Sequence, residues 1–255
     1  MNQNEMIREL QKIGIGQGTQ LEVHSSLSSF GYVEGGAEAL IGALKETVTE
    51  TGSIFMPALR LSPDLPLSED DRNNGIIRKI KILQDSEIRS RCGIVADTFR
   101  LLPDTRVQEG TFAVAAWGKN ADKVDTGLGY LIDHQGKALL LGVDIYSLTA
   151  MHYVENNMPE EMGRVFKSPG MDSLYSPDEW LIEDGEPPVK AWYRIQDMAY
   201  DAGLITEGRI GRCKYLYFTI SDVINLYKEA LQNDPFELYG LTKDRLSGSR
   251  LKDRQ

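Results

Sequence analysis

His152 and Glu155 have the residue types and the spacing that general base catalysis requires. On a helix, side chains three residues apart lie on one face, so the carboxylate of Glu155 can hold the imidazole of His152 in a single tautomer. A neutral imidazole oriented in this way can accept a proton near pH 7. The same spacing also occurs in ordinary surface pairs on helices. The pair alone leaves both interpretations open, a catalytic base with its partner and a surface contact.

A second group of residues surrounds a loop that could bind an anion. A short strand is predicted at Leu21–His24, and a serine-rich loop and a glycine pair follow it before the next helix. The residues of this group are His24, Ser25, Ser26, Leu27, Ser28, Ser29, Gly35 and Gly36. Backbone N–H groups in such a loop and at a helix N-terminus can bind phosphate. The motif is neither a Walker motif nor a dinucleotide fingerprint, so an ordinary serine-rich loop stays equally open.

The three histidines also raise the question of a metal. The HxxE spacing of His152 and Glu155 supplies two ligands, and His24 would have to converge with them to supply a third. We therefore expect no metal, and a metal-dependent hydrolase is the weakest alternative. His134 lies in the turn sequence Asp133–Gly136 and is expected to be an exposed turn residue.

The composition is that of a globular protein with an excess of acidic residues. The 255 residues include 28 Lys and Arg against 38 Asp and Glu, a formal net charge of -10, and 41% are hydrophobic. This acidity disfavours nonspecific nucleic-acid binding and favours cationic small molecules. No apolar run approaches the ~20 residues of a membrane span. Because Cys92 and Cys213 form no CxxC pair, we expect thiols in a reducing, cytoplasmic location, without a nucleic-acid or membrane partner.

Hydrophobic periodicity predicts the elements that must position these residues. Strand Leu21–His24, helix Ala37–Thr49 and strand Ser53–Met56 indicate a βαβ crossover, which places two parallel strands in one sheet. The other predicted helices are Glu5–Ile13, Ile88–Leu102, Met151–Asn157 and Ser221–Leu231. Ser221 is the predicted N-cap of the last of these helices. The other predicted strands are Ala113–Trp117, Ala138–Val143, Val189–Ile195 and Arg209–Thr219. The segment Arg60–Asn74 has no periodicity and is predicted to be a long loop.

These elements predict an α/β fold with a mixed, largely parallel central sheet flanked by helices. Residues 1–240 should form one α/β domain, and residues 241–255, which are rich in Lys, Arg and Ser, should form a frayed tail.

Short motifs along nearly the whole chain resemble one enzyme family. They are Val23-His24-Ser25-Ser26-Leu27 with Gly31 and Gly35-Gly36-Ala37, Met56-Pro57, Gly93–Arg100, Ala115-Ala116-Trp117-Gly118, Leu140–Val143, Thr149 with His152 and Glu155, and Gly208–Cys213. Each motif is weak alone. Their order and spacing together resemble the aminoglycoside 3-N-acetyltransferase family, the antibiotic N-acetyltransferases that are unrelated to the GNAT fold.

The resemblance implies an acetyl-CoA-dependent N-acetyltransferase that acts on an amine of an aminoglycoside or a related amino sugar. Acetyl-CoA would be the cosubstrate, and transfer to the amine would be direct. By the same resemblance, His152 would be the general base, Glu155 would support it, and Thr149 would donate to the thioester oxygen. The loop Ser25–Ser29 with His24, Gly35 and Gly36 would hold coenzyme A. A homodimer is a possible assembly.

The sequence also departs from this family. Many members carry an acidic residue six positions before the histidine, where this chain has Tyr146. A His-Pro pair is common where this chain has Glu109–Phe112, and the stretch Asp122–Tyr130 is short. These departures favour an acceptor other than an antibiotic, such as a biosynthetic amino sugar. They also keep open an alternative from another class, a non-catalytic or decayed CoA-binding protein of the same fold.

Overall fold

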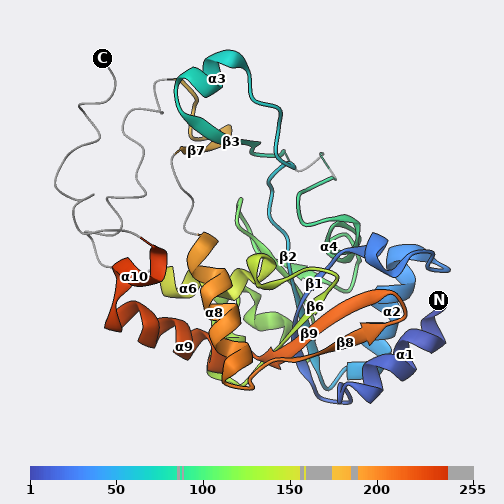
Figure 1. The fold of residues 1–255 in the computed structure, drawn as a ribbon. Helices are drawn as coiled ribbons and strands as arrows, with labels where there is room; N and C mark the ends of the chain where they lie inside the picture. Colours follow the sequence, from blue (N-terminus) through green and yellow to red (C-terminus); the bar gives the residue numbers. More distant parts are fainter. Residues whose placement is uncertain (85–86, 88, 156–157, 159–173, 185–188, 241–255) are drawn as a thin grey trace.

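A seven-stranded mixed sheet forms the centre of the protein (Figure 1). The computed structural model describes residues 1–84, 87, 89–155, 158, 174–184 and 189–240. In spatial order the strands are β4 (Arg106–Val107), β5 (Val114–Gly118), β2 (Ser53–Pro57), β1 (Gln20–Ser25), β6 (Lys137–Leu141), β9 (Cys213–Thr219) and β8 (Thr206–Ile210). The predicted parallel βαβ unit is confirmed, because β1 pairs with β2 in parallel and α2 (Gly36–Val48) connects them.

The prediction of a mixed sheet is confirmed, but the prediction that it is largely parallel is wrong. Among the described strands of this sheet, β1–β2 and β1–β6 are parallel, and the other four neighbouring pairs are antiparallel. Short connections account for two of these antiparallel pairs, β4–β5 and β8–β9, because a short connection forces neighbouring strands to run in opposite directions. The sequence run Arg209–Thr219 illustrates this, because Gly211, with φ of 58°, lies in a tight turn that separates β8 from β9.

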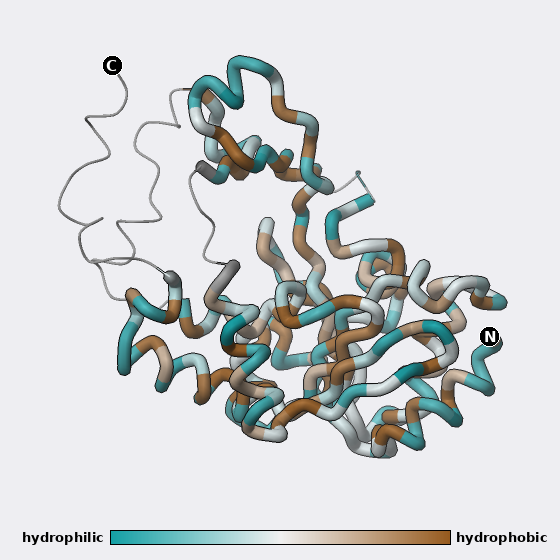
Figure 2. The backbone as a smooth tube through the Cα atoms, viewed as in Figure 1, coloured by the Kyte–Doolittle hydropathy of each residue, from teal (hydrophilic) through white to brown (hydrophobic). Residues whose placement is uncertain are grey.

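Two apolar layers cover the two faces of the sheet. Alternation along β6 places Leu139 and Leu141 in one layer and Ala138 and Leu140 in the other. The first layer includes α1 (Gln3–Lys12), α2 and α4 (Ile94–Phe99). The second includes α5 (Gly129–Asp133), α6 (His152–Glu155), α8 (Val189–Asp201), α9 (Ile220–Asn233) and α10 (Pro235–Tyr239). Figure 2 shows the brown, apolar segments gathered in and around the sheet.

Several predicted elements differ from the structure. Val189–Ile195 is not a strand but the first half of α8, whose buried residues Ala191, Trp192, Ile195 and Ala199 follow a helical period. A run of seven residues is too short for propensity to settle this, and packing against the core favours the helix. Helix α9 begins at Ile220 after Thr219, so Ser221 is not its N-cap.

Glycine and capping residues also shift the boundaries of helices. The helix predicted from residue 88 begins only at Ile94, because Gly93 before it has φ of 85°. The predicted loop Arg60–Asn74 contains a short helix, α3 (Glu69–Asn73), which begins with a capping box between Ser68 and Asp71. The end of the helix predicted at Met151–Asn157 and the predicted tail 241–255 lie outside the described residues.

A small separate layer stands apart from the main sheet. Strands β3 (Ile76–Lys81) and β7 (Trp180–Asp184) pair in antiparallel fashion, and α3 lies beside them (Figure 1). The layer is organised around the carboxylate of Asp71, which is buried and accepts hydrogen bonds from Tyr175 and Lys79. Lys79 Nζ also lies 4.4 Å from the ring centroid of Tyr175. These polar and cation–π contacts add to the packing of the buried side chains of Ile76 and Ile80.

Candidate active site

The site is built where the three parallel strands end. Strands β1, β2 and β6 end at the same edge, so the segments that follow β1 and β6 lie next to each other. Gly142, directly after β6, is the point of closest approach. A Cβ atom there would lie 2.0 Å from Ser29 Oγ, and the φ of 69° also requires glycine. The loop after β1 and the segment that leads to His152 are therefore in direct contact.

His152 and Glu155 form the predicted pair. His152 Nδ1 donates to Glu155 Oε2 at 2.7 Å, and the two residues bound α6. The His152 side chain is 61% exposed, whereas that of Glu155 is only 16% exposed. Because the carboxylate accepts the proton of Nδ1, the neutral ring carries its lone pair on Nε2. The geometry is that of a base with an orienting carboxylate.

Trp192 on α8 holds both members of this pair. Its Nε1 donates to Glu155 Oε1 at 2.8 Å, and its ring meets the His152 ring edge-on with centroids 4.9 Å apart. Trp192 is buried in the core, but its polar Nε1 also contributes to the site. The signal for this role is absent from the local sequence, because α8 is remote from α6 along the chain.

Two buried tyrosines extend the support behind Glu155. Tyr227 Oη donates to Glu155 Oε1 at 3.5 Å and is also hydrogen-bonded to Tyr239 Oη. Burial raises the pKa of Tyr227, and burial likewise raises the pKa of Tyr239. Both phenols therefore stay protonated over the whole physiological range and remain available as donors.

The serines of the loop are arranged by contacts within the protein. The loop continues from Ser25 into the 3₁₀ turn η1 (Leu27–Phe30), and the hydroxyl oxygens of Ser26 and Ser28 are 3.1 Å apart. Ser29 Oγ donates to the carbonyl of Ser26 at 2.7 Å and lies 2.9 Å from the buried Sγ of Cys213. Burial raises the pKa of the Cys213 thiol. Ser28 is the most exposed serine of the loop.

The glycine pair lies where the loop leads into the next helix. Gly35 and Gly36 have φ of 80° and 59° and lead into α2 without a side-chain cap. Gly35 lines a shallow hollow whose other residues are Asn2, Gln3, Asn4, Glu34, Glu38 and Ala39. No serine of the loop lines this hollow, and two of its residues carry a negative charge.

His24 and Thr149 lie together, away from the exposed serines. His24 is buried and pairs with Glu22, a residue that sequence reasoning did not single out. Thr149 begins the 3₁₀ turn η4 (Thr149–Met151), and its backbone nitrogen lies 3.4 Å from His24 Nε2. A glutamate between the apolar residues Leu21 and Val23 of a predicted strand is the signal that could have drawn attention to Glu22.

An aromatic surface continues from Trp192 past Tyr146. The ring centroid of Tyr146 lies 6.0 Å from that of Trp192 and 6.4 Å from that of Tyr193. Burial raises the pKa of Tyr193, and its neighbour Asp144 adds to this effect. Asp144 also caps the 3₁₀ turn η3 (Ile145–Ser147) by accepting from the backbone of Tyr146. Tyr146, in the place of an acidic residue, thus presents a phenol ring beside Trp192, which in turn contacts the base.

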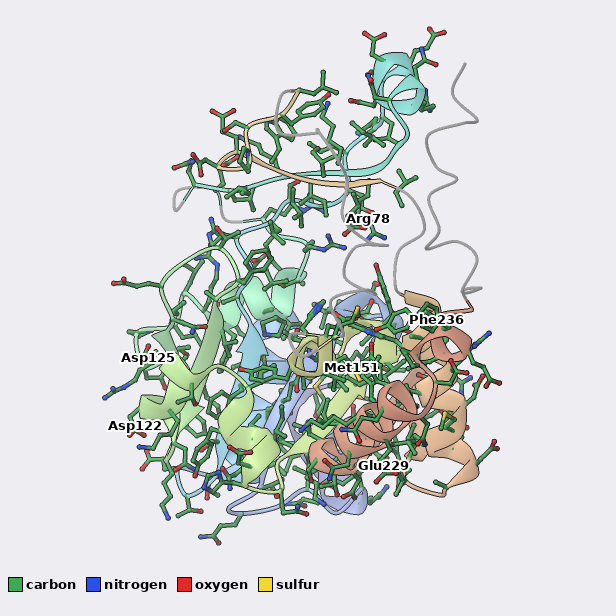
Figure 3. The ribbon with its side chains drawn as sticks, turned by 90° about the vertical axis from the view of Figure 1, so that its left-hand side faces the viewer. Arg78, Asp122, Asp125, Met151, Glu229 and Phe236 are labelled. Atoms are coloured by element: carbon green, nitrogen blue, oxygen red, sulfur yellow. The ribbon has the colours of Figure 1, made fainter. Side chains whose placement is uncertain are left out.

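Arg78 of β3 reaches this surface from the small layer. Figure 3 shows it on the side of that layer that faces Met151 and the main body. Arg78 pairs with Glu183 at 2.8 Å and with Asp64 at 3.1 Å. Burial alone would lower the pKa of Arg78, but Glu183, Tyr146 and Asp64 together raise it. The guanidinium of Arg78 stays charged, and the carboxylates of Glu183 and Asp64 balance its charge.

The alternatives of a metal site and a membrane span find no support in the described part of the chain. Within the described residues, no group of three or more His, Cys, Asp or Glu side chains is arranged to hold a metal, so His24, His152 and Glu155 do not converge in that way. In the same part of the chain, no helix has the length and apolar character needed to cross a bilayer.

Known proteins with similar sequences match over much of the chain. The model of the aminoglycoside 3-N-acetyltransferase family matches residues 23–232. A Bacillus subtilis (strain 168) protein, the SPbeta prophage-derived aminoglycoside N(3')-acetyltransferase-like protein YokD, is 32% identical over 59% of this chain and 63% of its own length. The aminoglycoside N(3)-acetyltransferase VII of Streptomyces paromomycinus is 26% identical over 82% of this chain and 76% of its own length. The matched segments thus cover about three fifths to three quarters of the length of these two relatives.

Solved structures share the fold. The apoenzyme of aminoglycoside acetyltransferase AAC(3)-IVa superposes with a TM-score of 0.70 at 22% identity and covers 97% of this chain and 94% of its own. A complex of AAC-IIIb with CoASH superposes with a TM-score of 0.66 at 17% identity and covers 91% of this chain and 97% of its own. The family model spans most of the chain and the same fold recurs in these structures, so this protein belongs to the aminoglycoside 3-N-acetyltransferase family.

Proposed function

We propose that this protein is an N-acetyltransferase that transfers the acetyl group of acetyl-CoA to an amine of an aminoglycoside or a related amino sugar. The observation that carries the proposal is the exposed imidazole of His152, held through Nδ1 by a nearly buried carboxylate. Family membership supports the reaction class. The relative AAC-IIIb bound to CoASH supports the donor, and AAC(3)-IVa bound to a gentamicin or to apramycin supports the kind of acceptor.

In the proposed reaction, the acceptor reacts as the neutral amine, because an ammonium has no lone pair and must first lose a proton to solvent. His152 Nε2 then removes a proton from the amine as its nitrogen bonds to the acetyl carbon. Glu155 would stabilise the imidazolium that forms, and by engaging Nδ1 it leaves Nε2 as the basic nitrogen. The carbon–sulfur bond then breaks, and the proton held by His152 can neutralise the departing thiolate. Thr149 is proposed to donate to the carbonyl oxygen while that oxygen carries negative charge.

The donor site is proposed to lie along the loop Ser25–Ser29, which adjoins the segment after β6 at Gly142. Ser28 and the backbone of η1 are the accessible groups there, and they would meet the phosphates or the pantetheine arm. Within this group, the buried His24 would contribute through its backbone, which continues into Ser25. Gly35 and Gly36 would contribute at the start of α2. Holding thioester and amine together would supply much of the rate enhancement.

The test of the base is His152→Ala. We expect kcat to fall by about 10²–10⁴-fold, because that is the usual contribution of a positioned general base. The measurement is release of the coenzyme A thiol, with a panel of aminoglycosides and simple amino sugars as acceptors. His134→Ala is the matched control, since His134 is an exposed histidine that only packs on Tyr130. Unchanged turnover in the His152 variant would contradict the assigned base.

The same panel tests the alternative of a CoA-binding protein without catalysis. Tyr146, which lies beside Trp192, motivates this alternative, since a phenol replaces an expected carboxylate. Calorimetry that detects coenzyme A binding, together with no turnover of any amine, would favour it. Turnover of an amino sugar but of no aminoglycoside would keep the enzyme and change its acceptor.

A further inference from the structure

Glu22 and His24 form a buried polar pair inside the sheet. Alternation along β1 directs Leu21 and Val23 into the layer of α1 and α2, so Glu22 and His24 point to the opposite face. His24 Nε2 donates to Glu22 Oε1 at 2.7 Å. Glu22 is fully buried, His24 is 7% exposed, and Glu22 Oε2 has no hydrogen-bond partner among the described residues. Such a pair needs an explanation, because burying a carboxylate costs free energy.

The pair contacts the backbone that leads into the base. The backbone N–H of Ala150 donates to Glu22 Oε1 at 3.3 Å, and the backbone nitrogen of Thr149 lies 3.4 Å from His24 Nε2. These two residues form the turn η4 with Met151, and His152 is the next residue after that turn. A central strand is the most rigid support available for this turn.

Stability alone does not account for the pair. Replacing a buried ion pair by apolar side chains of similar volume is often neutral or stabilising. The apolar neighbours Leu140 and Ala150 could accommodate such side chains. What apolar side chains could not supply is a fixed acceptor for the N–H of Ala150, and therefore a fixed direction for the turn.

We propose that Glu22 and His24 are positioning residues for acetyl transfer. The Glu22 carboxylate holds the turn through the N–H of Ala150, and His24 fixes the direction of that carboxylate, so that the side chain of Thr149 and the ring of His152 meet the reacting groups in the correct geometry. The proposal rests on the proposed acetyltransferase activity. His24 is then connected with the donor loop only through the chain, and its side chain serves the base segment.

The test compares three variants. In Glu22→Met the acceptor is lost and His24 is left unpaired, so we expect kcat to fall about tenfold or more, with the KM values for acetyl-CoA and amine within about twofold of wild type. In Glu22→Gln a side-chain oxygen can still accept from Ala150, so we expect kcat within about threefold of wild type. In the double variant Glu22→Met/His24→Leu no unpaired polar side chain remains and only the N–H of Ala150 lacks its acceptor, so we expect the unfolding temperature to recover in part while kcat stays low.

The outcomes separate this proposal from a merely structural role. Recovery of kcat together with stability in the double variant would overturn it, as would equal losses of kcat in Glu22→Gln and Glu22→Met. Leu10→Ala is the matched control for stability. Leu10 is buried on α1, outside the site, so this variant should lower the unfolding temperature without lowering kcat. A wild-type protein without any turnover would instead refute the proposed function, whatever the variants do.

Discussion

At the scale of single residues, the base depends on side chains that hold its carboxylate. Glu155 accepts from His152 through one oxygen and from Trp192 through the other, so its plane is set from two directions. An exposed carboxylate with one partner would rotate freely. The partly buried position of Glu155 makes both hydrogen bonds stronger than they would be in water.

Trp192→Phe should lower kcat about tenfold, because it removes the Nε1 donor to Glu155 and keeps an aromatic ring beside His152. That loss corresponds to about 1.5 kcal/mol, the lower end of the range for a hydrogen bond to a charged group. The measurement is steady-state kinetics of thiol release. Trp117→Phe is the control, since Trp117 donates to Asp104 on the other side of the sheet. Equal effects of the two substitutions would contradict the role of Trp192.

At the scale of elements, the junction at Gly142 joins the two halves of the site. Gly142→Ala should destabilise the protein by about 1–3 kcal/mol more than Gly203→Ala, which is a matched control. Both glycines have φ near 70°, but a Cβ at Gly203 meets nothing within 4 Å, whereas one at Gly142 meets Ser29. Chemical denaturation measures the difference.

We also expect a higher KM for acetyl-CoA only in Gly142→Ala, because the loop Ser25–Ser29 must move. Equal destabilisation by Gly142→Ala and Gly203→Ala would show that the loop Ser25–Ser29 moves without an extra loss of unfolding free energy.

The small layer of α3, β3 and β7 should depend on pH through Asp71. The hydrogen bond from Tyr175, followed by the backbone N–H of Ser68, holds the pKa of Asp71 well below its usual range. A lowered pKa in the folded state means that the carboxylate stabilises the layer above about pH 4, and that this stabilisation disappears as the pH falls through the folded-state pKa.

Hydrogen exchange of the β3 amides tests this dependence. In the wild type, protection should hold from pH 7 to about pH 4 and then decline on further acidification. In Asp71→Asn, protection should be low throughout, since the charged acceptor for Lys79 and Tyr175 is absent. Asp70→Asn, at an exposed neighbouring position, should behave like the wild type. Persistent protection in Asp71→Asn would assign the stability of the layer to other contacts.

At the scale of the whole molecule, the net charge of -10 should favour encounters with polycationic acceptors. The Debye length shortens from ~30 Å at 0.01 M salt to ~10 Å at 0.1 M, so long-range attraction is screened over this range. We expect kcat/KM for a polycationic aminoglycoside to fall several-fold between about 10 mM and 300 mM salt. A monoamine sugar should change less than about twofold. Equal salt dependence for both acceptors would show that charge does not select the acceptor.

Local sequence determined the elements with strong periodicity and the chemistry of the nearest neighbours. The βαβ unit around α2 was predictable because its helix has one apolar face and its strands are short apolar runs. The pairing of His152 with Glu155 was predictable because helical spacing brings side chains three residues apart together. The motifs, in their order, also indicated the family.

Only the tertiary structure decided what surrounds these residues. Whether Val189–Ile195 formed a strand or a helix depended on the core that it packs against, and this core also brings Trp192 to Glu155. The same holds for Glu22 and His24, which neighbour Thr149 and Ala150 only because β1 and β6 are adjacent in the sheet. Sequence patterns indicate contacts between residues only a few positions apart. The contacts described here join segments that are far apart in the chain, and Glu22 and His24 are more than a hundred residues from Thr149 and Ala150. Burial of a shared apolar face brings such segments together.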